Sequence, residues 1–164
     1  MDPLDLLAAV AAVAATFVGF TGVIFAVGRF SQGEWKASER HALVNMLVPS
    51  LVALFLAFVP MVVLTGTQAD MVVWRVSNAV FAVIHATLVT SALRLAVRGE
   101  LVEPIPLRFI LIPAGYISVV ASAMVAVGLL PRLAAMIYGG GLVWFLLIAA
   151  VQFVLLIVPA ARAA

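Results

Sequence analysis

Three polar residues of the third apolar segment are the first candidates for chemistry: His85, Asn78 and Arg75. Asn78 lies seven residues before His85, so their side chains lie on nearly the same face of a helix, with Arg75 a further turn out and offset around it. A titratable group in the middle of a membrane span is costly and is therefore a default candidate for function. The pattern predicts a polar strip that lines a water-filled path or binds an anion, and an imidazole that titrates near neutral pH can gate such a path or relay protons along it.

The same residues also fit a structural role. A neutral His85 can hydrogen-bond across helices to Asn45, Ser50 or Gln152 and so hold a bundle together. Arg75 can extend its guanidinium group toward the lipid headgroups. Asn45 and Gln152 are therefore candidates under both interpretations, either as polar lining of a path or as interhelical hydrogen-bond partners.

A stripe of small residues, charged at both ends, runs along the first apolar segment. Its members follow one another at alternating steps of three and four: Asp5, Ala8, Ala12, Ala15, Gly19, Gly22, Ala26 and Arg29. This spacing places them on one helix face. In a bilayer such a face lets two backbones approach closely, within the subunit or between subunits. Alternatively, the stripe lines a narrow pore in a ring of subunits, with Asp5 and Arg29 as charged rings at its ends.

Three consecutive glycines, Gly139 to Gly141, follow Tyr138 in the last apolar segment. A selectivity filter would need a supporting pore helix, and the segment from Pro131 to Ile137 is too short to be one. The glycines are therefore expected to loosen the helix locally or to let a neighbouring helix approach.

Several classes of active site are absent from the sequence. It contains no cysteine, no glycine-rich phosphate loop ending in Lys-Ser/Thr, no His-Glu-x-x-His and no dinucleotide fingerprint. Every acidic residue falls near a helix end or in a loop, so the apolar segments hold no carboxylate pair and no Glu-x-x-His metal site. Since His85 is the one reactive group clearly inside a predicted span, we expect no enzyme, no metal and no cofactor.

The composition is that of an integral membrane protein. Of the 164 residues, 66% are hydrophobic and 10% are charged, and the mean hydropathy is +1.29. A soluble domain carries much more charge on its surface. Five apolar runs are long enough to cross a bilayer, which takes about 20 residues each. We place these predicted helices at 4–27, 42–64, 71–96, 108–130 and 133–158.

The expected fold is an all-α bundle of five transmembrane helices, a single domain over residues 1–164 that packs through its first helix. Leu130-Pro131-Arg132 predicts a tight turn that makes an antiparallel hairpin of the last two helices. If that hairpin were re-entrant, four spans would remain. Ser31 and Glu34 match a capping box, which would start the second helix there; the alternative is a solvated linker.

The distribution of Lys and Arg predicts the orientation in the membrane. Seven of them lie in the first loop, around the third loop and in the tail: Arg29, Lys36, Arg40, Arg94, Arg98, Arg108 and Arg162. Arg75 and Arg132 fall on the other side. The positive-inside rule then places the N-terminus outside and the C-terminus in the cytoplasm, in a plasma or inner membrane.

The leading functional prediction is a small oligomeric channel or transport protein for an ion or proton. Five helices fill their own centre with side chains, so a homo-oligomer is the expected state. The alternative is a structural or accessory subunit of a larger membrane complex, which docks through the stripe and transports nothing. The lipid bilayer is the surrounding partner in both cases. A net charge of +2 is too small to indicate nucleic acid.

Overall fold

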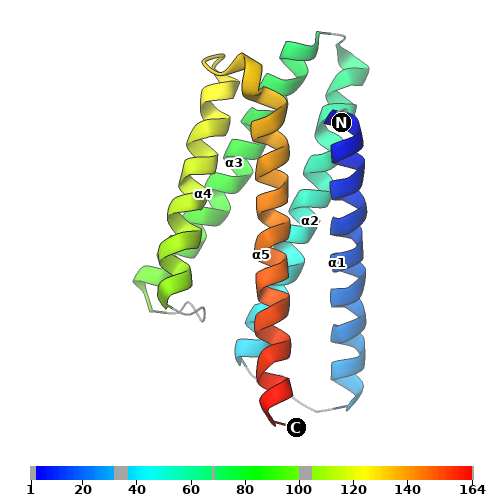
Figure 1. The fold of residues 1–164 in the computed structure, drawn as a ribbon, viewed down its shortest axis with the longest axis vertical. Helices are drawn as coiled ribbons and strands as arrows, with labels where there is room; N and C mark the ends of the chain where they lie inside the picture. The colour runs from blue at the N-terminus through cyan, green and yellow to red at the C-terminus, as the bar shows by residue number, and fades with distance from the viewer. Residues whose placement is uncertain (1–2, 32–36, 68, 100–104, 164) are drawn as a thin grey trace. The chain divides into compact units, whose positions relative to one another are not determined.

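The chain forms five long helices in a computed structural model (Figure 1). They are α1 (Pro3–Ser31), α2 (Ala37–Gly66), α3 (Asp70–Val97), α4 (Ile105–Ala126) and α5 (Ala134–Ala163), with a 3-10 turn η1 (Pro131–Leu133) before α5. The structure describes residues 3–31, 37–67, 69–99 and 105–163, and side chains within 3–27, 40–67, 69–99 and 107–156. These residues contain no strand. The prediction of an all-α fold is confirmed.

Each of the five helices contains an apolar stretch of 20 to 28 residues, long enough to cross a bilayer. The stretches in the last two helices are 20 and 26 residues long. The re-entrant alternative is therefore unnecessary, and the chain is that of a membrane-embedded protein. The predicted capping box falls on Ser31, the last residue of α1, and on Glu34, which lies outside the described residues.

The helices divide into two compact units. The first unit comprises Met1–Phe58 and Leu142–Ala164, that is α1, most of α2 and most of α5. The second unit comprises Val59–Gly141, that is the end of α2, all of α3 and α4, η1 and the beginning of α5.

The first unit has an apolar core. Leu43 and Met46 of α2 and Ala149 of α5 are buried at its centre. The partly buried residues packed against them are Phe17, Ile24, Phe153 and Leu156. The buried side chains of α1 recur at steps of three, four and seven and so share one face of the helix: Leu7, Val10, Ala14 and Thr21.

Glycines bring the helices of the second unit close together. A Cβ atom at Gly115 of α4 would lie 2.6 Å from Cγ2 of Val89 on α3, closer than real atoms approach. A Cβ atom at Gly141 of α5 would collide with the ring of Phe81 on α3. The prediction that the glycine triplet lets a neighbour approach is confirmed at Gly141, whereas Gly140 has open space around it.

A glycine also ends α4. Gly128 has a φ of +87°, and its N–H donates to the carbonyl of Val125 at 2.9 Å. The N–H of Leu129 donates to the carbonyl of Met124 at 2.8 Å. Together these two bonds form a Schellman motif, which needs a left-handed residue directly after the helix. The helix therefore ends earlier than predicted, and the chain reverses through η1 into α5.

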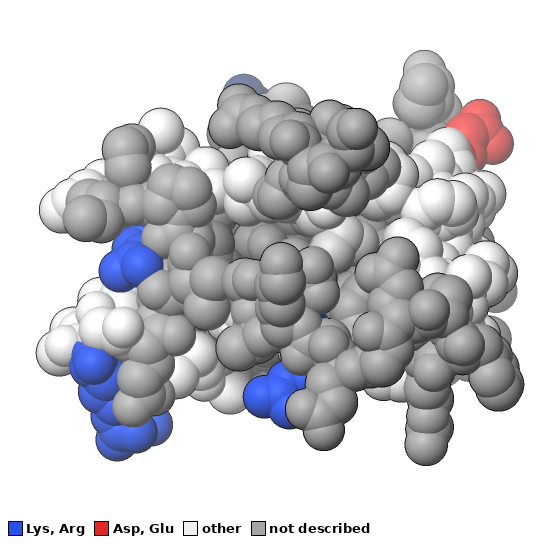
Figure 2. Space-filling model, turned by 90° about the horizontal axis from the view of Figure 1, so that it is seen from below, with Lys and Arg blue, Asp and Glu red and all other residues white. Residues whose placement is uncertain are grey.

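Basic residues gather at one end of the second unit. Arg94 and Arg98 lie at the end of α3, and Arg108 lies near the start of α4. Since α3 and α4 pack against each other in opposite directions, these three residues lie at the same end. Figure 2 looks at this end, where arginine side chains stand out in blue among uncharged and undescribed residues.

Candidate functional site

The predicted polar face of α3 exists, but only two of its three residues lie on it. Asn78 and His85 are both buried, at 0% and 1% exposure. They share this buried face with Ser77 and Phe81. Arg75 is exposed, and its guanidinium group contacts the end of α4. Asn78 and His85 thus share one buried face of α3. Arg75 does not belong to that face, because its position on the helix is rotated away from theirs.

Asn78 joins α3 to the beginning of α5. Its Nδ2 atom donates to the carbonyl of Ala134 at 3.1 Å and to the carbonyl of Trp74, one turn earlier on α3, at 2.9 Å. Both hydrogens of the amide group are thus used. Its Oδ1 atom is buried and has no hydrogen-bond partner among the described residues.

His85 lies between an aromatic ring and a glycine. The ring centroids of Phe81 and His85 are 5.1 Å apart, with an interplanar angle of 81°, an edge-to-face arrangement. On α4, a Cβ atom at Gly115 would come within 3.5 Å of His85 Nε2. The small size of Gly115 therefore keeps the backbone of α4 close to this nitrogen.

An aromatic row continues from His85 along the same unit. Phe81 meets Tyr138 of α5 with centroids 5.9 Å apart, and Tyr138 meets Trp74 of α3 at 6.1 Å. Both contacts are edge-to-face. Tyr138 is fully buried. This row of edge-to-face contacts packs against His85 and joins α3 to the beginning of α5.

Two serine hydroxyls are buried without a hydrogen-bond partner among the described residues, like Oδ1 of Asn78. Ser77 of α3 and Ser122 of α4 are fully buried, and neither Oγ atom has a hydrogen-bond partner within the described part of the chain. Burying an unsatisfied polar group costs about 1–3 kcal/mol. Three buried oxygens of this kind, at Ser77, Asn78 and Ser122, are therefore unusual in a membrane span.

These groups lie at successive depths along α3 and α4. The hydrogen bond from Arg75 to Ala126 and the approach of His85 to Gly115 fix the antiparallel register. Ser122 then falls between the levels of Arg75 and His85. Further along, the hydroxyls of Thr90 and Tyr116 are 3.3 Å apart across the two helices.

The polar groups extend across most of a bilayer core. From Ser77 to Thr90 along α3 is about 20 Å at a rise of about 1.5 Å per residue. The hydrocarbon core of a bilayer is about 30 Å thick. We call the set Ser77, Asn78, His85, Thr90, Tyr116 and Ser122 the α3–α4 polar line.

Arg75 has a partner of its own. Its Nε atom donates to the carbonyl of Ala126, the last residue of α4, at 3.0 Å. Its guanidinium group also lies beside Gly128, where a Cβ atom would meet it at 3.5 Å. Arg75 therefore caps α4 at the end of the polar line.

The predicted partners Asn45, Ser50 and Gln152 belong to the first unit, whereas His85 belongs to the second. Asn45 Nδ2 is 2.7 Å from Nε2 of His41, one turn earlier on α2. Ser50 Oγ donates to the carbonyl of Met46 at 2.7 Å. Gln152 is buried on α5. Local bonds on α2 thus engage two of the three side chains that the structural interpretation had assigned to His85.

The small-residue stripe of α1 lies on the side of the helix opposite its buried face. Its members from Asp5 to Ala26 are all exposed, and a Cβ atom at Gly19 or Gly22 would meet nothing within 4 Å. The side chain of Arg29 lies outside the described residues. Of the alternatives for the stripe, packing within the chain does not hold for its described members, because α1 buries its Leu7 and Thr21 face.

No three His, Asp or Glu side chains in the described part of the chain come close enough to hold a metal ion. No protein-family model, no curated protein and no solved structure matches this chain.

Sequence reasoning missed several members of the site. Ser77, Thr90 and Tyr116 are common residues in membrane helices and carry no motif. Gly115 and Gly141 are the residues in the sequence that could have indicated the site, because each lies where a neighbouring helix approaches α3. Which residue of α3 each glycine meets depends on the register of the pair, and the sequence does not contain that register.

Proposed function

We propose that this protein is a small membrane channel or transport protein that passes a proton or a small cation along the α3–α4 polar line, and that it works as a homo-oligomer. The observation that supports it is the set of three buried oxygens, at Ser77, Asn78 and Ser122, that find no protein partner among the described residues. An apolar span has no packing reason to keep such groups, since each destabilises the fold.

Each group has a defined role in this proposal. The serine hydroxyls and Asn78 Oδ1 replace part of the hydration shell of the passing species, as oxygen ligands do in filters. His85 accepts and releases a proton at the middle of the line. Phe81 and Gly115 hold the imidazole in place.

Flux into liposomes tests the proposal. The purified protein is reconstituted with a pH-sensitive dye inside, and proton or potassium gradients are imposed at several pH values. We expect wild-type flux above that of empty liposomes, with a pH dependence that His85→Ala and His85→Gln abolish while the protein remains folded. His41→Gln is the matched control, because it removes the chain's other histidine, which lies in the first unit.

Two results would refute transport along this line. One is wild-type flux no greater than that of empty liposomes. The other is flux whose pH dependence is the same in wild type and in both folded His85 variants. Loss of folded protein in His85→Ala together with unchanged flux from folded His85→Gln would support the structural interpretation of His85.

A second candidate function is supported by the exposed stripe on α1. Small residues at this spacing, left uncovered by the chain's own helices, suit close packing against another transmembrane helix. The protein would then be an accessory subunit of a larger membrane complex. Gly19→Leu should abolish recovery of that complex from native membranes, with Ala9→Leu as a control on another exposed face of α1.

The orientation belongs to the proposal as well. Arg94, Arg98 and Arg108 gather at one end of the second unit, as the positive-inside rule requires of a cytoplasmic end. We therefore place the N-terminus outside and the C-terminus in the cytoplasm of a plasma or inner membrane. Modification of single cysteines introduced at Asp5 and Arg98 by an impermeant reagent on intact cells tests it, since only the first should react.

A further inference from the structure

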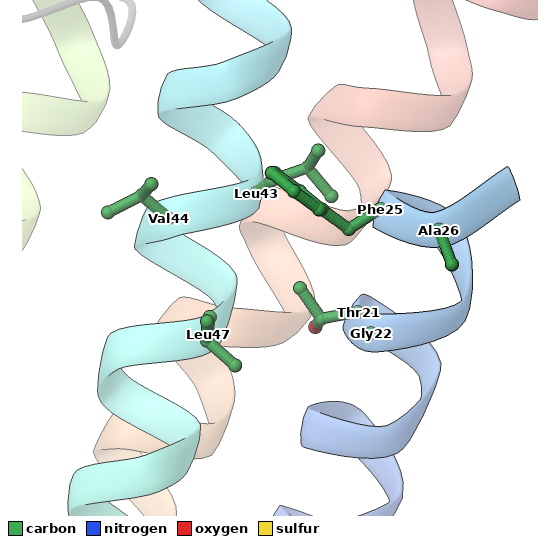
Figure 3. A pocket seen from close by; sticks show the side chains of 7 residues that line it. All are labelled: Thr21, Gly22, Phe25, Ala26, Leu43, Val44 and Leu47. Carbon is green, nitrogen blue, oxygen red and sulfur yellow. The ribbon is translucent and has the colours of Figure 1, made fainter. Parts of the chain in front are cut away.

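A groove runs between α1 and α2 in the first unit (Figure 3). Its volume is about 700 Å³, which is in the range of ligand pockets. Thr21 and Phe25 project from α1 toward α2, and Leu43 and Leu47 project from α2 toward α1. Leu43 is buried and forms part of the floor, whereas Phe25 is about half exposed. The groove is therefore open on one side and closed on the other.

The lining of the groove is apolar. Its one hydroxyl, Thr21 Oγ1, donates to the carbonyl of Phe17 in its own helix at 2.6 Å. Gly22 leaves part of the wall without a side chain, and a Cβ atom there would meet nothing within 4 Å. An occupant therefore gains by burying hydrocarbon and finds no free hydrogen-bond donor on the described lining.

A positive charge lies at one end of the groove. Arg40 is in the first turn of α2 and is exposed. It precedes the lining residues Leu43, Val44 and Leu47 by three, four and seven positions, which places all four on one face of α2. The positive end of the helix dipole adds to the charge of Arg40. An anion bound by Arg40 would thus lie near the end of the apolar groove that is closest to the start of α2.

We propose that the groove binds one acyl chain of an anionic phospholipid whose phosphate pairs with Arg40. Basic residues next to grooves between membrane helices recognise such headgroups. A second copy of the chain in the same orientation fits less well, since it would bring its own Arg40 to the same end and set like charges together. The proposal is independent of transport, because the groove and the α3–α4 polar line belong to different units.

Native mass spectrometry of the delipidated full chain tests this site. Phosphatidylglycerol and phosphatidylcholine with identical acyl chains are titrated separately, and the bound fractions give two affinities. We expect phosphatidylglycerol to bind at least about fivefold more tightly, the effect of one basic residue near a headgroup. Arg40→Gln should remove that preference. Gly22→Leu should lower the affinity for both lipids by about tenfold or more, because its side chain occupies the groove.

Matched variants separate this site from the general lipid surface. Arg98→Gln removes an exposed arginine of the second unit, and Gly19→Leu makes the same change one turn from Gly22 at a position that is equally open and outside the lining. Both should bind like wild type. Equal affinities for the two lipids, or losses as large in the controls as in the site variants, would overturn the proposal. The proposal would also be overturned if the wild-type chain formed a dimer, or carried a co-purified protein, and the Gly22→Leu variant did not.

Discussion

Arg75 on α3 closes the C-terminal end of α4. Its Nε atom donates to the carbonyl of Ala126 at 3.0 Å, across 51 positions of sequence. The last carbonyls of a helix have no partner within it. The Schellman bonds engage those of Met124 and Val125, and Arg75 engages that of Ala126. The guanidinium charge also lies at the negative end of the helix dipole. Arg75 thus has a structural role that needs no transported ion.

Arg75→Met should lower the free energy of unfolding by about 1–2 kcal/mol, since it removes a charge-assisted hydrogen bond and a favourable charge at a helix end. Denaturant unfolding in detergent micelles, followed by circular dichroism, measures the change. Arg132→Met is the control, because Arg132 lies in η1 near the same end of the unit. An equal effect of the two substitutions would contradict the capping role.

Gly141→Ala should destabilise the protein, whereas Gly140→Ala should not. A methyl group at Gly141 collides with the ring of Phe81, and overpacking of this kind costs about 1–3 kcal/mol. At Gly140 the same methyl group meets open space and should raise stability by roughly 0.5 kcal/mol through helix propensity. Thermal unfolding midpoints distinguish the two.

The double variant Phe81→Leu/Gly141→Ala is the check on the mechanism. A smaller side chain at position 81 makes room for the methyl group, so Gly141→Ala should cost less in that background than in wild type. An unchanged cost would show that the destabilisation of Gly141→Ala does not come from the contact with Phe81.

Ser122→Ala should leave the free energy of unfolding unchanged or raise it by up to about 1 kcal/mol, because its buried hydroxyl has no partner among the described residues. Ser50→Ala is the matched change, since Ser50 is equally buried but donates to the carbonyl of Met46. Ser50→Ala should lower the free energy of unfolding by about 1 kcal/mol, because it removes this hydrogen bond. If Ser122 lines a path, Ser122→Ala should also reduce proton or cation flux in liposomes, and Ser50→Ala should not.

Asn78→Leu should loosen the start of α5. The substitution removes the hydrogen bond from Asn78 Nδ2 to the carbonyl of Ala134, which joins two helices. Loss of a buried hydrogen bond of this kind costs about 1–3 kcal/mol. Hydrogen exchange in nanodiscs should become faster for the amides of the first turns of α5. Unchanged protection there, with the protein folded, would count against this tether.

The five helices were predictable because each is a long apolar run, and length is what a bilayer requires of a span. The shared buried face of Asn78 and His85 was predictable as well, since a spacing of seven returns to the same side of a helix. Gly128, a few residues before Pro131, indicates where α4 ends. The predicted helix was too long because the apolar run continues past Gly128.

The sequence does not indicate which face of each helix is buried. The faces of α1 are nearly equal in hydrophobicity, so the visible pattern was the small stripe, and the helix buries Leu7, Val10 and Thr21 instead. The capping partner of Arg75 was equally hidden, because it depends on the register of α3 against α4. Periodicity fixes which residues share a face, and the face that is buried depends on the neighbours.

The polar line also bears on how the chain enters the bilayer. Among the described spans, α3 has the lowest mean hydropathy, 1.8 against 2.0 to 2.6 for the others. Asn78 and His85 disfavour its partition into lipid as a lone segment. Gly115 of α4, which is synthesised later, lies against His85. Insertion of α3 is therefore expected to be completed together with α4, so a ribosome stalled before α4 emerges should leave α3 accessible to water.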